Sequence, residues 1–130
     1  MARLNLKAVE ERVSPLAGRE SYDREFIFDL LLAYGKPQSS VTRLRNGDLN
    51  VAADPATEVA QKKVVYFKET TSDPLAVLEQ LKTSPDVVRF STRFVVVTDY
   101  DELVAHDTQT GETIGFPIRE INQHFTFFLP

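Results

Sequence analysis

The chain has 130 residues, of which 42% are hydrophobic and 26% charged, and its formal net charge is −4. These values are ordinary for one soluble globular domain that spans residues 1–130. Cysteine is absent, which excludes disulfides and thiolate metal sites, and no apolar run approaches the roughly 20 residues of a membrane helix.

The charge is unevenly distributed along the chain. Residues 36–68 carry six Lys or Arg against three acids, whereas residues 69–130 carry four against ten. The net negative charge argues against a free-standing nucleic-acid binder, but a basic edge on an acidic module can contact phosphates. The N-terminus lacks the apolar core of a signal peptide, so we expect a cytoplasmic protein without a membrane partner.

Two helices are predicted in the N-terminal part of the chain. Apolar residues at near-helical spacing predict a helix over residues 4–13. Pro15 should end this helix, because the residue before a proline is pushed out of the α region. Residues 21–34, SYDREFIFDLLLAY, predict a second helix with Ser21 as its cap and Gly35 as its left-handed stop.

Residues 41–52 predict a β-hairpin. Apolar residues flank Asn46-Gly47, a pair suited to the positive φ angles of a tight β-turn. The flanking residues are Val41, Leu44, Leu49 and Val51. Residues 53–61 predict a polar connection.

The centre of the chain predicts a strand, a helix and a second strand. Val64–Phe67 and Phe94–Thr98 are uninterrupted apolar runs, which is typical of strands buried on both faces. Between them, Asp73 can cap a helix with Pro74 at its first position, and Ser84-Pro85 should close it. We expect both strands at the centre of a mixed sheet. The residues expected to cover them are Leu30, Leu31, Leu78 and Leu81.

The C-terminal part predicts two further strands and a helix. Leu103–His106 should pair antiparallel with Phe94–Thr98, Thr113–Phe116 should follow, and residues 118–125 have helical spacing. The sequence then ends on the apolar FFLP. Since natural C-termini are usually polar, we expect residues 1–130 to be a fragment of a larger protein.

Lys68 directly follows a buried apolar strand. In a metal-dependent nuclease, such a lysine helps to activate water or stabilises the charge that develops at phosphorus. Alternatively, it marks the point where a core strand reaches solvent. Asp48 is a candidate carboxylate ligand for Mg²⁺, with Glu25 as an accessory acid, because hard cations prefer oxygen; the alternative for Asp48 is ordinary turn chemistry after Asn-Gly.

Tyr66 stands where a nuclease of this kind would place an acid. Residues two apart share one face of a strand, so an acid there would meet the metal beside Lys68. Separately, four basic residues are candidates for contact with a DNA backbone. They are Arg43, Arg45, Lys62 and Lys63.

A resemblance to a known family covers residues 21–130. It is carried by SYDREFIFDLLLAYGKPQSSVTRLRNGDLN, KKVVYFKE, RFVVVTDYDELVAHDTQTGE and HFTFFLP. These segments resemble the N-terminal region of bacterial restriction-modification proteins, the single-chain type IIG enzymes with an adenine-specific DNA methyltransferase domain downstream. The order of elements also resembles the αβββαβ core of PD-(D/E)xK nucleases, a mixed sheet flanked by helices.

The resemblance implies an Asp on the second strand, Glu-x-Lys on the third, and magnesium as cofactor. Asp48 and Lys68 match that pattern, and Tyr66 replaces the glutamate. Double-stranded DNA and the downstream methyltransferase domain of the same polypeptide are the implied partners.

Three hypotheses follow for the function. The first is a metal-dependent type II DNA endonuclease domain, or a degenerate descendant of one, in which Asp48, Lys68 and Glu25 form the catalytic site. The second is a non-catalytic DNA-positioning or docking module that supports the methyltransferase, which Tyr66 favours. The third is an unrelated small α/β binding domain whose basic edge is accidental.

Overall fold

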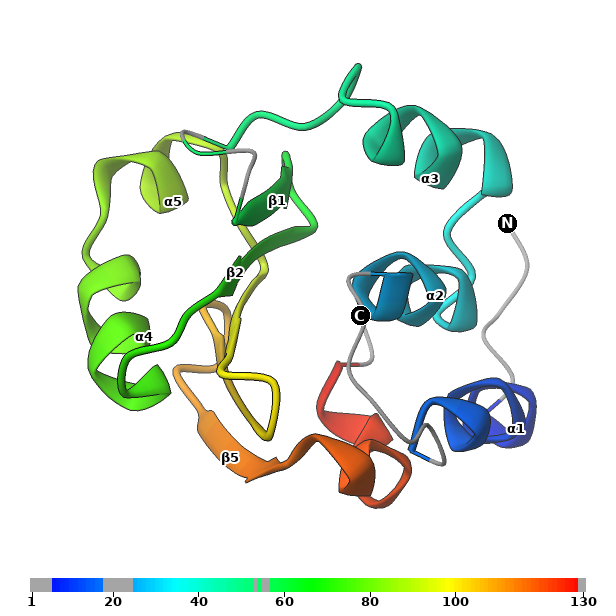
Figure 1. Cartoon of the computed structure of the whole chain (residues 1–130). Helices are drawn as coiled ribbons and strands as arrows, with labels where there is room; N and C mark the ends of the chain where they lie inside the picture. The colour runs from blue at the N-terminus through cyan, green and yellow to red at the C-terminus, as the bar shows by residue number, and fades with distance from the viewer. Residues whose placement is uncertain (1–5, 18–24, 53, 55–56, 129–130) are drawn as a thin grey trace.

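A mixed five-stranded sheet forms the middle layer of the molecule (Figure 1). The computed structural model describes residues 6–17, 25–52, 54 and 57–128. The strand order is β1-β2-β3-β4-β5, in which β2 and β3 are parallel and the other neighbours are antiparallel. The strands are β1 (Glu58–Gln61), β2 (Val65–Glu69), β3 (Phe94–Thr98), β4 (Glu102–Asp107) and β5 (Thr113–Pro117).

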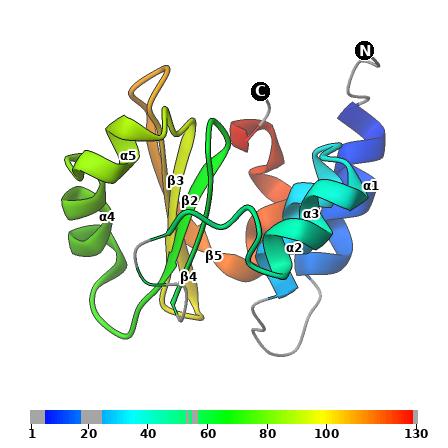
Figure 2. The same ribbon diagram turned by 90° about the horizontal axis from the view of Figure 1, so that it is seen from above.

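Helices cover both faces of the sheet, which confirms the predicted α/β class (Figure 2). Helices α4 and α5 lie on one face, and the remaining helices lie on the other. The bounds are α1 (Leu6–Ala17), α2 (Glu25–Ala33), α3 (Gln38–Arg45), α4 (Pro74–Lys82), α5 (Pro85–Arg89) and the 3-10 helices η1 (Ile118–Gln123) and η2 (Phe125–Phe128). Among the described residues, no helix is long and apolar enough to cross a membrane.

β3 is the central strand and β2 is interior beside it, so neither apolar run lies at an edge of the sheet, as predicted. Phe67 and Val96 face the core under α2, whereas Tyr66 and Val95 face α4. This division follows from the period of two along a strand. The predicted cover is also confirmed: Leu30 and Leu31 pack in the first core, and Leu78 and Leu81 pack in or against the second.

The parallel pairing of β2 with β3 requires a crossover, which α4 and α5 supply. The Asp73 side chain accepts a hydrogen bond from the backbone N of Leu75 at 3.3 Å, with Pro74 opening α4 as predicted. Ser84-Pro85 does follow the end of α4, but it also opens α5, where the Ser84 side chain accepts from the backbone N of Asp86. Proline suits the first turn of a helix because no intrahelical partner is lost there.

The predicted hairpin over residues 41–52 is wrong, because residues 41–45 belong to α3. Val41 and Leu44, spaced three apart, are both buried on one helix face. Asn46-Gly47 ends that helix: Gly47 has φ +95°, its backbone N donates to the Leu44 carbonyl, and the Asp48 N donates to the Arg43 carbonyl at 2.9 Å. This is the paired hydrogen bonding of a glycine-terminated helix, which uses the same positive φ that a hairpin turn would need.

Residues 53–61 contain a strand where a connection was predicted, and two strands rather than three therefore precede α4. The outer edge of β1 is covered by the preceding segment. Val51 N donates to the Ala60 carbonyl, and the Asn50 side-chain oxygen accepts from Ala60 N at 2.9 Å. This cover satisfies backbone groups that an edge strand would otherwise expose.

Two terminal helices also differ from the prediction. Helix α1 continues past Pro15 to Ala17, because Leu16 extends the buried face of Val9 and Val13, and packing outweighs the local preference for a break. At the other end, the helix predicted over residues 118–125 is replaced by η1 and η2. Gly35 ends α2 with φ +84° as predicted, whereas the cap predicted at Ser21 lies outside the described residues.

Candidate functional site

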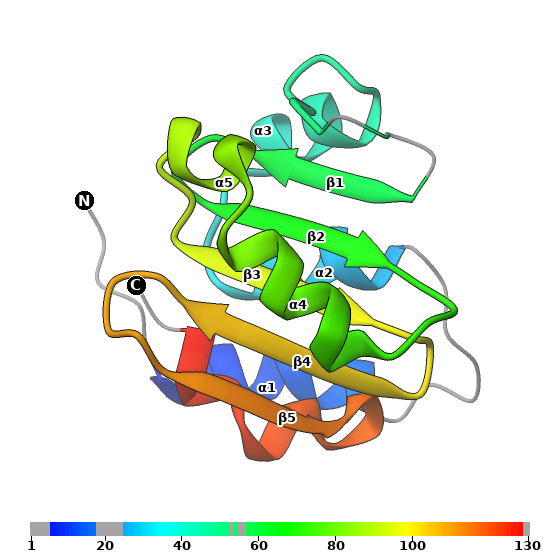
Figure 3. The same cartoon turned by 90° about the vertical axis from the view of Figure 1, so that its left-hand side faces the viewer.

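Three side chains of β1 and β2 form a bonded group that we call the carboxylate cluster: Glu58, Tyr66 and Lys68. Glu58 lies directly opposite Lys68 in the antiparallel register. The Lys68 Nζ lies 2.9 Å from the Glu58 Oε2, and the Tyr66 hydroxyl donates to the Glu58 Oε1 at 2.7 Å. The cluster sits where β2 ends and β1 begins, at one end of the sheet (Figure 3).

The Glu58 carboxylate is buried and therefore depends on these bonds. Glu58 is 6% exposed and Tyr66 is 2% exposed, while the Lys68 side chain is 25% exposed. A buried carboxylate is costly unless it is both paired and hydrogen-bonded. The backbone N of Asp54 adds a third donor, at 3.2 Å from the Glu58 Oε1, so both carboxylate oxygens are engaged.

The residues around Lys68 do not fit a magnesium site. Mg²⁺ needs near-octahedral oxygen ligands, usually including one or two carboxylates. Here the carboxylate that contacts Lys68, that of Glu58, is bound to a cation, a phenol and a backbone amide, and Tyr66 stands where a second acid would be. Among the described residues, no group of three His, Cys, Asp or Glu is arranged to hold a metal ion.

Asp48 and Glu25 lie in other parts of the fold. Asp48 is exposed in the turn after α3, and is not on a strand as predicted. Glu25, at the start of α2, accepts from Arg45 of α3, whose Nη2 lies 2.8 Å from the Glu25 Oε2. The catalytic roles of Asp48, Glu25 and Lys68 remain predictions, and the carboxylate that contacts Lys68 is Glu58.

The predicted DNA-contacting residues lie on two elements. Arg43 and Arg45 belong to α3, where Arg45 also lies over the Phe28 ring at 5.0 Å from its centroid. Lys62 and Lys63 form the exposed turn between β1 and β2. The structure therefore separates the four cations into a helical pair and a turn pair.

The turn pair is part of a rigid corner. Lys63 has φ +68°, and its backbone N donates to the Phe90 carbonyl at 2.9 Å. Lys62 and Arg89 both lie near the Phe90 ring, with distances to its centroid of 5.8 and 4.6 Å. A non-glycine residue at positive φ is uncommon and persists where surrounding contacts over-determine it.

A second buried ion pair joins the residue before β3 to the last residue of β4, at the same end of the sheet as Lys62. Arg93 contacts both carboxylate oxygens of Asp107, at 2.9 and 3.0 Å. The hydrogen bond from Arg93 lowers the pKa of Asp107 to about 2, and backbone donors from Gln109 and Thr110 act in the same direction. This fork-like pairing is a structural bond that fixes the β4–β5 turn.

Glu58 was missed by sequence reasoning, yet a local signal for it exists. The segments EVAQ and VYFKE pair as antiparallel strands around the turn at residues 62–64. That register alone puts Glu58 opposite Lys68. The turn signal of Asn46-Gly47 obscures it, because a hairpin over residues 41–52 leaves residues 53–61 as a connection.

The mixed sheet covered by helices on both faces places the domain in the α/β class, with a strand-end lysine paired to a buried acid as its candidate site. Within that class, the chain belongs to the family of MmeI N-terminal domains, whose model matches residues 4–130. It is 32% identical over 122 residues to "DNA methyltransferase A" of Bacillus subtilis (strain 168). The match covers 93% of this chain but 14% of that relative. No solved structure matches the chain.

Proposed function

We propose that this domain is a nuclease-like module of a restriction-modification protein that positions DNA for a methyltransferase and does not itself cut. The family of MmeI N-terminal domains and the relative named as a DNA methyltransferase support the setting. Because the chain spans a small part of that relative, the methyltransferase and DNA are proposed partners.

The observation that carries the proposal is that both carboxylate oxygens of Glu58 are already bound within the carboxylate cluster. Cleavage would need Lys68 near a scissile phosphate and carboxylate oxygens free for a metal. Lys68 instead neutralises Glu58, and the Tyr66 hydroxyl occupies the other carboxylate oxygen. Freeing Glu58 for a metal would break its bonds to Lys68 and to the Tyr66 hydroxyl.

Cations on the surface support contact with the DNA backbone. Arg43, Lys62 and Lys63 are exposed, and exposed Lys and Arg neutralise phosphates with release of counterions. Such contacts carry little base-sequence information. The domain would therefore orient the duplex, and any recognition of sequence would come from another part of the protein.

Metal-dependent cleavage of DNA is the second candidate. It is favoured by the 2.9 Å contact between Lys68 and Glu58, which keeps a lysine and an acid together at the end of a strand. If the cluster descends from a magnesium site, Tyr66→Glu should restore binding of Mn²⁺. The readout is a metal-dependent rise in melting temperature, because a ligand that binds only the folded state stabilises it.

Two assays on the purified chain test the proposal. Fluorescence anisotropy with a labelled DNA duplex should show binding that weakens as salt rises. Arg43→Ala and Lys62→Ala should each weaken binding and reduce the salt slope by about 1, the change expected on losing one phosphate contact. Arg119→Ala, an exposed cation on η1, is the matched control and should bind like the wild type.

The second assay measures nicking of supercoiled plasmid with Mg²⁺ or Mn²⁺. We expect no cutting. Robust metal-dependent cutting that is abolished by Lys68→Ala would refute the positioning proposal and establish the second candidate. Absence of both binding and cutting would leave a docking role toward the rest of the protein.

A further inference from the structure

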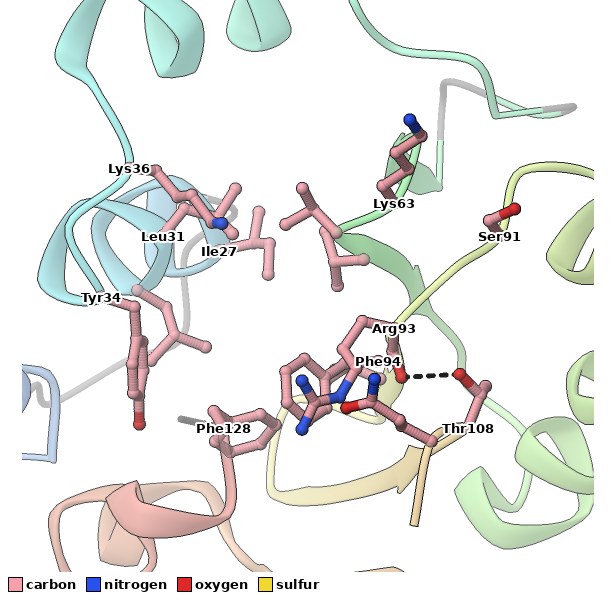
Figure 4. A pocket seen from close by; sticks show the side chains of 15 residues that line it. Ile27, Leu31, Tyr34, Lys36, Lys63, Ser91, Arg93, Phe94, Thr108 and Phe128 are labelled. Atoms are coloured by element: carbon pink, nitrogen blue, oxygen red, sulfur yellow. Dashed lines mark hydrogen bonds between the residues drawn. The ribbon is translucent and has the colours of Figure 1, made fainter. Parts of the chain in front are cut away.

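A cavity of about 370 Å³ opens at the end of the sheet opposite the carboxylate cluster. Its walls come from α2, the β1–β2 turn, the start of β3 and η2 (Figure 4). Figure 3 shows that the β1–β2 turn, the beginning of β3 and the β4–β5 turn meet at this end. The volume falls in the range of roughly 300–1,000 Å³ that is typical of ligand pockets.

The interior of the cavity is apolar. Ile27 and Leu31 of α2 face Phe94 across it, Phe128 contributes a further ring, and Val64 also lines it. The Phe94 and Phe128 rings contact each other edge to face, with their planes inclined at 64° and their centroids 5.6 Å apart. Such a wall binds an aliphatic or aromatic group by excluding water from it.

Three of the polar side chains of the wall are already engaged. The Tyr34 hydroxyl donates to the Phe125 carbonyl, and the Thr108 hydroxyl donates to the Thr92 carbonyl at 2.6 Å. The Arg93 guanidinium is bound to Asp107. A nucleobase in this cavity would find these three groups already bonded, whereas an apolar side chain needs no hydrogen-bonding partner.

The mouth of the cavity is cationic. Lys36 stands on the α2 side and Lys63 on the β1–β2 side (Figure 4), and no acidic side chain is among the described residues of the lining. None of the described acids forms an ion pair with Lys36 or Lys63, in contrast to Arg93. Two cations beside an apolar hollow are complementary to an apolar group with a carboxylate next to it.

From this complementarity we propose that the cavity binds a short acidic segment of a protein partner. One large apolar side chain of the segment enters between α2 and the sheet, and neighbouring Asp or Glu carboxylates meet Lys36 and Lys63. A buried anchor inside a polar rim is the usual arrangement of a peptide-binding hot spot. The site is separate from DNA positioning, although Lys63 adjoins both.

Panning a random short-peptide phage library against the purified chain tests the proposal. Enriched peptides should share an aliphatic or aromatic residue beside Asp or Glu. A fluorescein-labelled copy of the enriched peptide is then measured by anisotropy. Lys36→Glu should weaken its binding by roughly tenfold, since an attraction at the rim becomes a repulsion.

Three further variants make the result specific. Val64→Phe, which places a larger side chain in the cavity, should abolish peptide binding, with a thermal melt to verify folding. Arg119→Glu should bind like the wild type, and Arg43→Ala should weaken DNA binding but leave peptide binding unchanged. The peptide result is thereby separated from the DNA result, so that either proposal can fail alone.

Four outcomes would overturn the inference. Three concern the peptide: an enriched consensus without acidic residues, no consensus at all, or binding that Lys36→Glu does not weaken. The fourth is binding of a labelled single-stranded oligonucleotide that Val64→Phe abolishes, because the occupant would then be a nucleotide. If Val64→Phe fails to fold, the effect of Lys36→Glu on binding of the labelled peptide still tests the inference.

Discussion

The two ends of the sheet differ in whether their lysines are paired with an acid. At the end that holds the carboxylate cluster, Lys68 is bound to the buried Glu58, and the acid has donors on both of its oxygens. At the cavity, Lys36 and Lys63 line an apolar hollow without an acidic partner among the described residues. A buried charge must be satisfied within the protein, whereas a charge at an open mouth remains available to a ligand.

This difference shows that the lysine in the nuclease-like position, Lys68, is not among the cations that are most accessible to a ligand. The pattern of a strand-end lysine points to Lys68, but in the fold this lysine is already paired with Glu58. The cations that can still meet a ligand are on the turn between β1 and β2, on α3 and beside α2. The following predictions test that contrast, from the largest expected effect to the smallest.

Val96→Asp should unfold both ends of the sheet together. Val96 is 1% exposed in the central strand β3, and an unpaired charge there should cost several kcal/mol, more than about 4. Thermal denaturation followed by circular dichroism measures the loss. A fall of less than a few degrees would contradict the burial of Val96.

Lys68→Ala should destabilise the fold by about 2–4 kcal/mol, because it leaves the Glu58 carboxylate buried without its cation. Asp48→Ala is the matched control, since Asp48 is exposed, and it should change stability by less than about 0.5 kcal/mol. Urea denaturation compares them. The double variant Glu58→Leu with Lys68→Met should recover most of the loss, and failure to do so would argue against a closed ion pair.

The Asp107–Arg93 pair should give the fold a measurable dependence on acid. Since the folded pKa of Asp107 is lowered to about 2 from an ordinary value of 3.8, its stabilisation is present above pH 4 and is lost as the pH falls through 2. The shift corresponds to about 2 kcal/mol. Urea denaturation from pH 5 down to pH 2 should show a shallower decline for Asp107→Asn than for the wild type, and equal declines would contradict the pairing.

Tyr66→Phe should have the smallest effect, about 1 kcal/mol, because it removes one hydrogen bond to Glu58 and keeps the packing of the ring. The same urea measurement detects it, with Tyr100→Phe on the exposed surface as control. No loss beyond that of the control would show that the phenol does not hold the carboxylate.

The sequence predicts part of the candidate site, and there is a specific reason why it does not predict the rest. The sequence places Lys68 at its strand end and shows Tyr66 in place of the acid expected there. It points to Asp48 as the carboxylate of the site, a metal ligand, because Asn46-Gly47 favours a β-turn. A glycine at positive φ serves a hairpin turn and a helix end equally well, so local chemistry did not distinguish them.

The sequence by itself determined the elements whose signals agree with one another. The apolar runs of β2 and β3, the cap and proline of α4, and the glycine stop of α2 each specify one local structure. Only the tertiary structure decided that α3 is a helix, that α1 continues through Pro15, and that Glu58 meets Lys68. Those outcomes depend on burial of Val41, Leu44 and Leu16 and on strand register, which join residues that local propensity treats separately.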